Sequence, residues 1–182
     1  MSRRALATTA VALFATVSIA AGGCSSTVDR QYVQEGLPVH LGNLEYNVQI
    51  SRLLNPNDAE DQAYLQGAPP LPRNDYYLGI FLQVHNHGSS TESLPTRYVV
   101  TDTEHDVFLP VPVQNEFALQ LGGTVPAHGQ VPDRESMASS GPIEGLMLLF
   151  LIHTSTTENR PLILKIPAAP GDGHPARIEL DL

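Results

Sequence analysis

Two histidines, His85 and His87, are separated by a single residue at the end of a run of alternating apolar and polar positions. Successive side chains of a β-strand point to opposite faces, so both imidazoles are expected on one face. Two imidazoles on one face can begin a Cu²⁺ or Zn²⁺ site, which His105 or a carboxylate could complete. The competing interpretation is a polar, solvent-facing strand end beside a turn.

The residues next to these histidines have a structural interpretation. The side chain of Asn86 can cap its own turn by hydrogen bonding to the backbone. Gly88 can adopt a positive φ angle there. We therefore expect a tight turn at the end of this strand.

Two groups of acidic and amide side chains lie in segments expected to be loops or turns. They are Asp102, Glu104 and Asp106 in one segment, and Asn57, Asp58, Glu60 and Asp61 in the other. Oxygen-rich loops can bind Ca²⁺, but neither segment has the glycine and terminal glutamate spacing of an EF-hand. We interpret both groups as solvated turn residues.

The only cysteine, Cys24, closes a segment organised like an export signal. The first four residues carry two positive charges, residues 5–21 carry none, and two glycines precede the cysteine. A basic start, an apolar run and small residues before a cleavage point are typical of a secretory signal. A single cysteine also excludes an intramolecular disulfide and a multi-cysteine zinc site.

The segment Ala21-Gly22-Gly23-Cys24 resembles the lipobox of bacterial lipoprotein signal peptides. The resemblance implies cleavage after residue 23 and a diacylglyceryl group on the Cys24 thiol. Ala21 departs from the family pattern, which has Leu at that position. The alternatives are a free or buried thiol and an uncleaved anchor, since the uncharged run is at the lower length limit for a membrane span. Ser2-Arg3-Arg4 is also similar to a twin-arginine signal, so the export route stays open.

The overall composition excludes several functions. The 182 residues include ten Lys and Arg against nineteen Asp and Glu, a formal net charge of −9. Nucleic-acid backbones are bound by clustered cations, so no nucleic-acid partner is expected. The chain has no Gly-x-Ser-x-Gly elbow, phosphate-binding glycine loop or His-Glu-x-x-His motif, so we expect no enzyme and no cofactor.

Alternating apolar and polar residues predict several β-strands in the rest of the chain. In residues 44–50 the apolar face runs from Leu44 to Ile50, and residues 78–84 alternate in the same way. Residues 98–100 and 107–109 predict a hairpin, and the continuous apolar run 146–152 predicts a central strand. Two more strands are expected at 162–166 and 176–182. Fifteen prolines and the lack of a helical stripe favour an all-β, immunoglobulin-like antiparallel β-sandwich.

The predicted organisation has three parts. Residues 1–23 form a signal peptide with a signal helix, residues 24–37 a lipidated cysteine and disordered tether, and residues 38–182 the sandwich domain. Two connections, 55–75 and 114–145, are longer than a sandwich needs, and the second is expected to hold an edge strand around Phe117 and Leu119.

The segments 77–88, 98–102 and 141–152 resemble an immunoglobulin-like domain of unknown function found in bacterial, especially actinobacterial, lipoproteins and secreted antigens. The resemblance implies an extracytoplasmic sandwich and brings no catalytic residues. We therefore expect a non-enzymatic binding or interaction module, held at the membrane by a lipid on Cys24, with an envelope protein as candidate partner. The alternative is an extracytoplasmic Cu- or Zn-binding protein that uses His85 and His87.

Overall fold

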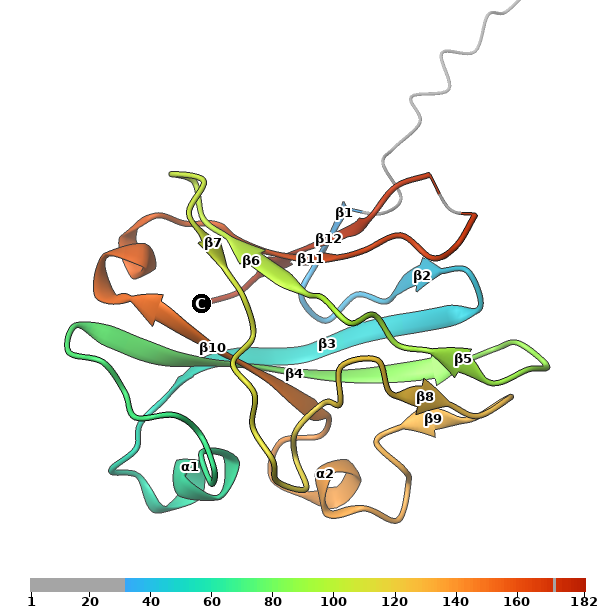
Figure 1. Ribbon diagram of the computed structural model, residues 1–182, viewed down its shortest axis with the longest axis horizontal. Coiled ribbons are helices and arrows are strands. Elements are labelled where there is room, and N and C mark those ends of the chain that lie inside the picture. The colour runs from blue at the N-terminus through green and yellow to red at the C-terminus, as the bar shows by residue number, and fades with distance from the viewer. Residues whose placement is uncertain (1–31, 172) are drawn as a thin grey trace, which may run out of the picture.

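Two β-sheets form most of the molecule (Figure 1). The computed structural model describes residues 32–171 and 173–182, so Cys24 and the predicted signal peptide lie outside the described residues. The first sheet contains, in spatial order, β1 (Tyr32–Gln34), β12 (Ala176–Leu180), β11 (Leu162–Ile166), β6 (Val99–Thr101) and β7 (Val107–Phe108). The second contains β10 (Leu146–His153), β4 (Asp75–Asn86), β3 (Leu44–Leu54) and β2 (Val39–Leu41), and β9 (Gln130–Val131) also pairs with β4.

The remaining elements are short. They are the paired strands β5 (Glu92–Ser93) and β8 (Thr124–Val125), the helices α1 (Ala59–Tyr64) and α2 (Met137–Ser140), and a 3₁₀ helix over Thr154–Glu158. The predicted all-β sandwich is confirmed. In the described part of the chain, no helix has the length and apolar character needed to cross a membrane.

The main core lies between the two sheets. The inward face of β4, with Leu78, Ile80, Leu82 and Val84, is fully buried, as its alternation predicts. It belongs to the same core as residues of β6, β11 and β12 in the first sheet. The predicted hairpin is also confirmed, since β6 and β7 pair in antiparallel orientation.

Strand β3 departs from simple alternation at a β-bulge. Its register with β4 shifts between Val48 and Ile50, and a shift of one residue exchanges the two faces of a strand. Ser51 is consequently buried at 4% exposure, whereas Ile50 is 38% exposed. The prediction that Ile50 continues the inner apolar face was wrong. The Glu35 carboxylate accepts hydrogen bonds from both the backbone N–H and the hydroxyl of Ser51.

The sandwich also begins earlier than the sequence predicts. Strand β1 pairs in parallel with β12, and the N–H of Glu35 donates to the carbonyl of Glu179 at 2.8 Å. The tether prediction is therefore wrong for residues 32–37, while residues 24–31 lie outside the described part. Backbone hydrogen bonds and the Glu35 carboxylate hold these residues in place. Because such contacts require no alternation of apolar residues, the sequence pattern did not reveal the strand.

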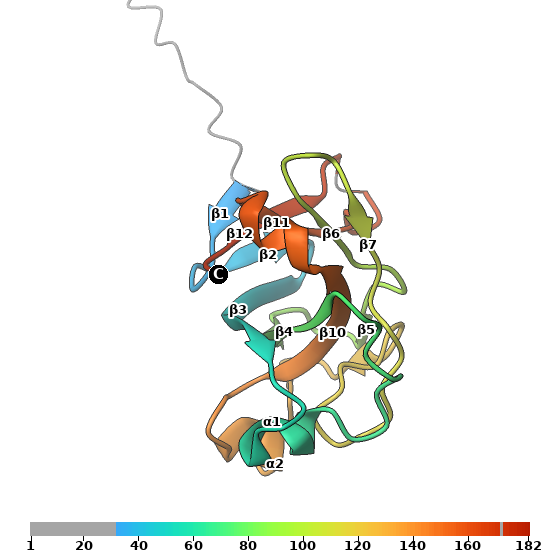
Figure 2. The same ribbon diagram turned by 90° about the vertical axis from the view of Figure 1, so that its left-hand side faces the viewer.

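A third layer, which contains α1 and α2, covers part of the outer face of the second sheet (Figure 2). A second apolar cluster lies beneath it, formed by Leu54, Tyr64, Tyr77, Phe81, Met147 and Leu149. The ring of Tyr64 in α1 packs edge-on against Phe81 at 4.9 Å and Phe117 at 4.8 Å between ring centroids. Much of this cover comes from the two long connections, in which the sequence predicted no helix.

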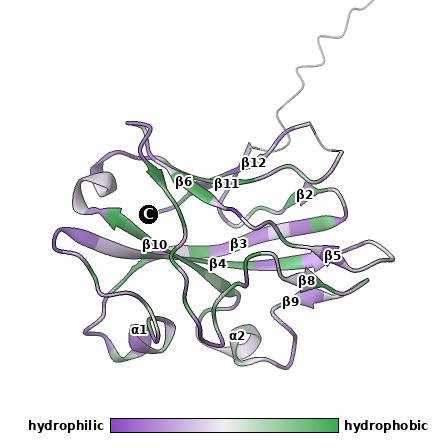
Figure 3. Cartoon of the chain, in the orientation of Figure 1, coloured by the Kyte–Doolittle hydropathy of each residue, from purple (hydrophilic) through white to green (hydrophobic). Residues whose placement is uncertain are grey.

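Strand β10 is apolar on both faces, as its continuous run predicts (Figure 3). It stands at the end of its sheet rather than at the centre, and two loop segments pair with its free side. The N–H of Val111 donates to Leu149 O at 2.8 Å, and that of Leu119 donates to Met147 O at 2.9 Å. The edge pairing expected around Phe117 and Leu119 is present as an isolated bridge of Ala118 to Met147.

Candidate functional site

An exposed cluster of His40, Glu45 and His87 lies at one end of the second sheet. The pairing of β2 with β3 places His40 opposite Glu45, and the pairing of β3 with β4 places Glu45 opposite His85. Their neighbours along the strands point into the main core, so these polar side chains project from the outer face. His87 directly follows β4.

The Glu45 carboxylate stands between the two imidazoles. Its Oε2 atom is 3.3 Å from Nε2 of His40 and 3.1 Å from Nε2 of His87. The ligand-type atoms of the three residues all lie within 4.8 Å of one another. The side chains of His40 and His87 are 61% and 59% exposed, against 25% for Glu45. Two imidazole nitrogens and one carboxylate oxygen thus converge where solvent reaches them.

Of the three histidines singled out from the sequence, only His87 belongs to this cluster. His85 shares its face, as expected, and the two rings stack with centroids 6.5 Å apart. His105 lies in the turn between β6 and β7, in the other sheet, and is not part of the cluster. The set of His85, His87 and His105 is therefore not brought together.

Sequence reasoning missed His40 and Glu45, because cross-strand neighbours are set by register. One signal could have revealed them. Gly42 and Asn43 form a two-residue connection between β2 and β3, and a Gly-Asn pair between apolar runs is a hairpin signal. A two-residue hairpin turn fixes the register, and this register places His40 opposite Glu45.

Asn86 holds the backbone that precedes His87. Its side chain is buried at 2% exposure, and its Oδ1 atom accepts the N–H of Gly88 at 2.9 Å. The predicted cap of its own turn is confirmed. Its Nδ2 group donates to three carbonyl oxygens, those of Ser90 (2.8 Å), Val125 (3.0 Å) and Pro126 (3.0 Å).

Gly88 serves a different purpose from the one predicted. Gly88 is not among the described residues that have a positive φ angle, so that expectation was wrong. A Cβ atom at this position would stand 2.9 Å from the Asn43 side chain. The turn therefore needs glycine for the close approach of the β2–β3 connection.

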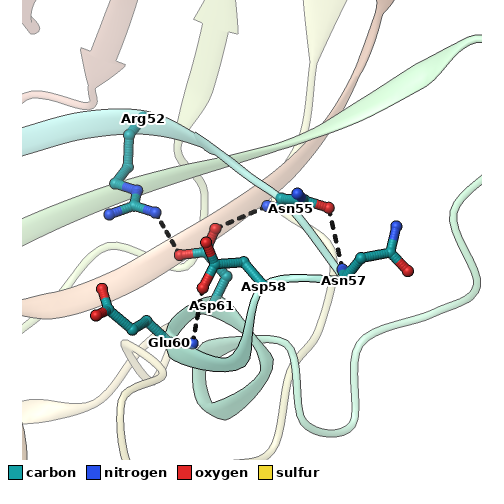
Figure 4. Close-up of polar contacts among 6 residues, drawn as sticks. All are labelled: Arg52, Asn55, Asn57, Asp58, Glu60 and Asp61. Atoms are coloured by element: carbon teal, nitrogen blue, oxygen red, sulfur yellow. Dashed lines mark hydrogen bonds and ion pairs between the residues drawn. The ribbon is translucent and has the colours of Figure 1, made fainter.

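The acidic residues of the first long connection serve the fold (Figure 4). Asp58 caps α1 by accepting the N–H of Glu60 at 2.9 Å. Asp61 is buried at 1% exposure, forms an ion pair with Arg52 and accepts the N–H of Asn55 at 2.8 Å. These contacts fasten α1 to the end of β3.

In the second acidic segment, too, a carboxylate stabilises the fold by accepting hydrogen bonds. Asp102 accepts the N–H of Asp106 at 2.9 Å and a bond from the Asn159 amide at 3.3 Å. Apart from the cluster around Glu45, no group of three His, Cys, Asp or Glu ligands with metal-binding separations occurs in residues 32–171 and 173–182.

A groove of about 320 Å³, lined by apolar side chains and by polar atoms, lies along the side of β10 that faces away from β4. Its walls are the loop segments 110–114 and 118–121, and its floor is residues 147–149. Leu121 on one wall is 44% exposed. Concave surfaces that combine apolar side chains with some polar groups are typical of binding sites.

No protein-family model matches the chain, and no curated protein matches it. It is similar to the structure of an uncharacterized β-sandwich protein of Clostridium difficile 630, with a TM-score of 0.51 and 11% identity over 83% of this chain and 94% of that chain. This likeness shows the β-sandwich fold.

Two further structures are similar at lower scores. The yjhA protein of Bacillus subtilis has a TM-score of 0.47 and 12% identity, over 81% of this chain and 98% of that chain. The ycdA protein of Bacillus subtilis subsp. subtilis strain 168, provisionally described as a lipoprotein, has a TM-score of 0.44 and 14% identity. That alignment covers 80% of this chain and 39% of the ycdA chain.

Proposed function

We propose that the protein is a lipid-anchored, non-enzymatic binding module of the bacterial cell envelope, displayed outside the cytoplasmic membrane. The export-signal pattern that ends at Cys24 supports the anchor. A diacylglyceryl group supplies two acyl chains, which anchor a protein more firmly than one. The groove along β10 is the observation that carries the binding role.

The fold supports an orientation in which the groove and the third layer point away from the membrane. Tyr32, where β1 begins, is eight residues after Cys24, and eight extended residues reach at most about 29 Å. Strand β1 lies on the side of the molecule opposite α1 and α2 (Figures 1 and 2). A lipid on Cys24 therefore keeps the β1 side near the bilayer and leaves the opposite side free for a partner.

The groove fits an apolar segment of an envelope protein. Pro110, Val111 and Val113 form one wall, and Leu119 and Leu121 contribute to the other. Burial of apolar surface contributes about 25 cal/mol per Å², so a few inserted side chains give useful affinity.

Photocrosslinking in envelope membranes tests the groove. A photoreactive residue at Gln120, in one wall of the groove, should capture a protein partner. Leu121→Glu places a charge in the groove and should abolish that capture. Met137→Glu is the matched control, because Met137 is 60% exposed and does not line the groove. Equal capture by the two glutamate variants would contradict binding in the groove.

Mass spectrometry of the membrane-extracted chain tests the anchor separately. The expected N-terminal peptide begins at Cys24 and carries the mass of the acyl groups, and Cys24→Ser should lose that mass. An N-terminal peptide that begins at Cys24 without acyl mass would refute the lipid anchor, whatever the outcome of the crosslinking.

A further inference from the structure

We propose that His40, Glu45 and His87 form a binding site for a divalent transition-metal ion of the Zn²⁺ type. The site lies on the open face of β2, β3 and β4, and it depends neither on the lipid anchor nor on the groove. It replaces the set expected from the sequence, because register brings His40 and Glu45 to His87 in place of His85 and His105.

The separations of the ligand atoms match those around zinc. Zinc binds imidazole nitrogen and carboxylate oxygen at about 2.0–2.2 Å in tetrahedral geometry, which places neighbouring ligand atoms about 3.3–3.6 Å apart. The distances from Glu45 Oε2 to the two Nε2 atoms are 3.3 and 3.1 Å, close to that separation, and without metal the shorter one is a hydrogen bond to His87. The two imidazole nitrogens lie within 4.8 Å of each other, and small rotations of these exposed side chains bring them to a common ion.

The backbone that carries the ligands is already held in place. His40 and Glu45 are register partners in a two-residue hairpin, and the N–H of His87 donates to Asn43 O at 2.9 Å. The buried Asn86 side chain fixes the turn immediately before His87 through its hydrogen bonds. A site whose backbone does not have to be ordered on binding retains more of its ligand affinity.

The donor set selects the class of ion. Imidazole suits zinc and copper, whereas calcium and magnesium prefer sites made entirely of oxygen. Three protein ligands leave a fourth position of a tetrahedral ion open. Because His40 and His87 are mostly exposed, that position faces solvent, where water or a ligand group from a partner can occupy it.

Isothermal titration of the untagged full chain in detergent with ZnCl₂ tests the proposal. The expected result is one Zn²⁺ per chain. His40→Ala, Glu45→Gln and His87→Ala should each weaken binding by about 10- to 100-fold or more, since loss of even an outer-shell partner typically costs that much. Equal urea midpoints without metal would show that the variants are folded.

Two matched variants separate this site from the alternatives. His105→Asn keeps a residue that tolerates the positive φ of 68°, and it should bind Zn²⁺ like the unmodified chain. His85→Ala should retain binding within about threefold, a difference below 1 kcal/mol. Loss of binding with His85→Ala but not with His40→Ala would overturn the ligand set. Equal weak binding by all variants would show adventitious surface binding and overturn the site.

Discussion

The outer face of the second sheet has two unlike halves, and β4 runs through both. In its first half, the outward side chains of Tyr77 and Phe81 are buried at 5% and 0% exposure beneath the third layer. In its second half, the outward residues Gln83 and His85 are only partly buried, and His87 beyond them is exposed. One strand thus supports a covered apolar surface and an open polar surface on the same side.

The difference shows what the long connections do. Exposed aromatic and aliphatic side chains on a sheet are costly in water, so the apolar half requires a cover, which comes from residues 64–71, 111–117 and Ile143. The polar half needs none, and its imidazoles and carboxylate stay accessible. Cover variants should therefore destabilise the fold, whereas open-face variants should change binding and leave the free energy of unfolding nearly unchanged.

Removal of an aromatic ring from the covered half should have the largest effect. Phe81→Ala leaves a cavity beneath Tyr64 and should lower the free energy of unfolding by about 3–5 kcal/mol. His85→Ala, on the same face of the same strand, should change it by no more than about 0.5 kcal/mol. Urea unfolding of both variants measures the difference, and similar losses would remove the distinction between the halves.

The anchor of the third layer should be next in effect. Asp61→Ala removes the partner of Arg52 and the acceptor of the Asn55 N–H. The loss should be about 1.5–3 kcal/mol, the range for a hydrogen bond to a charged group. In hydrogen-exchange measurements, the substitution should increase the exchange rate of the α1 amides more than that of the β3 amides. Unchanged protection of α1 would show that the apolar contacts alone hold the layer.

The cap of α1 should contribute less than its anchor. Asp58→Ala removes the acceptor for the Glu60 N–H and should cost about 1 kcal/mol, a typical value for an N-cap. Asp58→Ser retains a capping oxygen and should recover most of that loss in the same thermal unfolding assay. A serine variant as unstable as the alanine variant would mean that the cap hydrogen bond is not the cause.

The open half should show the smallest change in stability. Without metal, His40→Ala removes an exposed pair with Glu45 and an exposed ring contact with His87. Such a pair is worth at most about 1 kcal/mol. Zinc at a hundredfold excess over its dissociation constant should stabilise the unmodified chain by about 2.7 kcal/mol and His40→Ala by much less. Calorimetric melting with and without ZnCl₂ tests this, and equal zinc effects on both proteins would count against His40 as a ligand.

Local alternation predicted the strands well, because burial of one face of a strand leaves a period of two in its sequence. The failures have other causes. The bulge in β3 moves Ile50 outward, and no residue in the sequence signals that bulge. Strand β1 is held by backbone hydrogen bonds and Glu35, which leave no apolar pattern. One of the three residues of the candidate site was predicted: His87 stands in a visible pair, but His40 and Glu45 join it only through hairpin register. The helix α1 depends on the Asp58 cap and the buried Asp61 carboxylate, and in the sequence these two residues look like any other acidic residues of a loop.

X-ray absorption at the zinc edge tests the open-face site most directly. For the full chain with one equivalent of Zn²⁺, the account predicts a first shell of nitrogen and oxygen at about 2.0–2.2 Å, with outer-shell scattering from two imidazole rings. In His40→Ala that scattering should fall to one ring. A first shell of oxygen alone, or two-ring scattering that persists in the variant, would contradict a site formed by His40, Glu45 and His87.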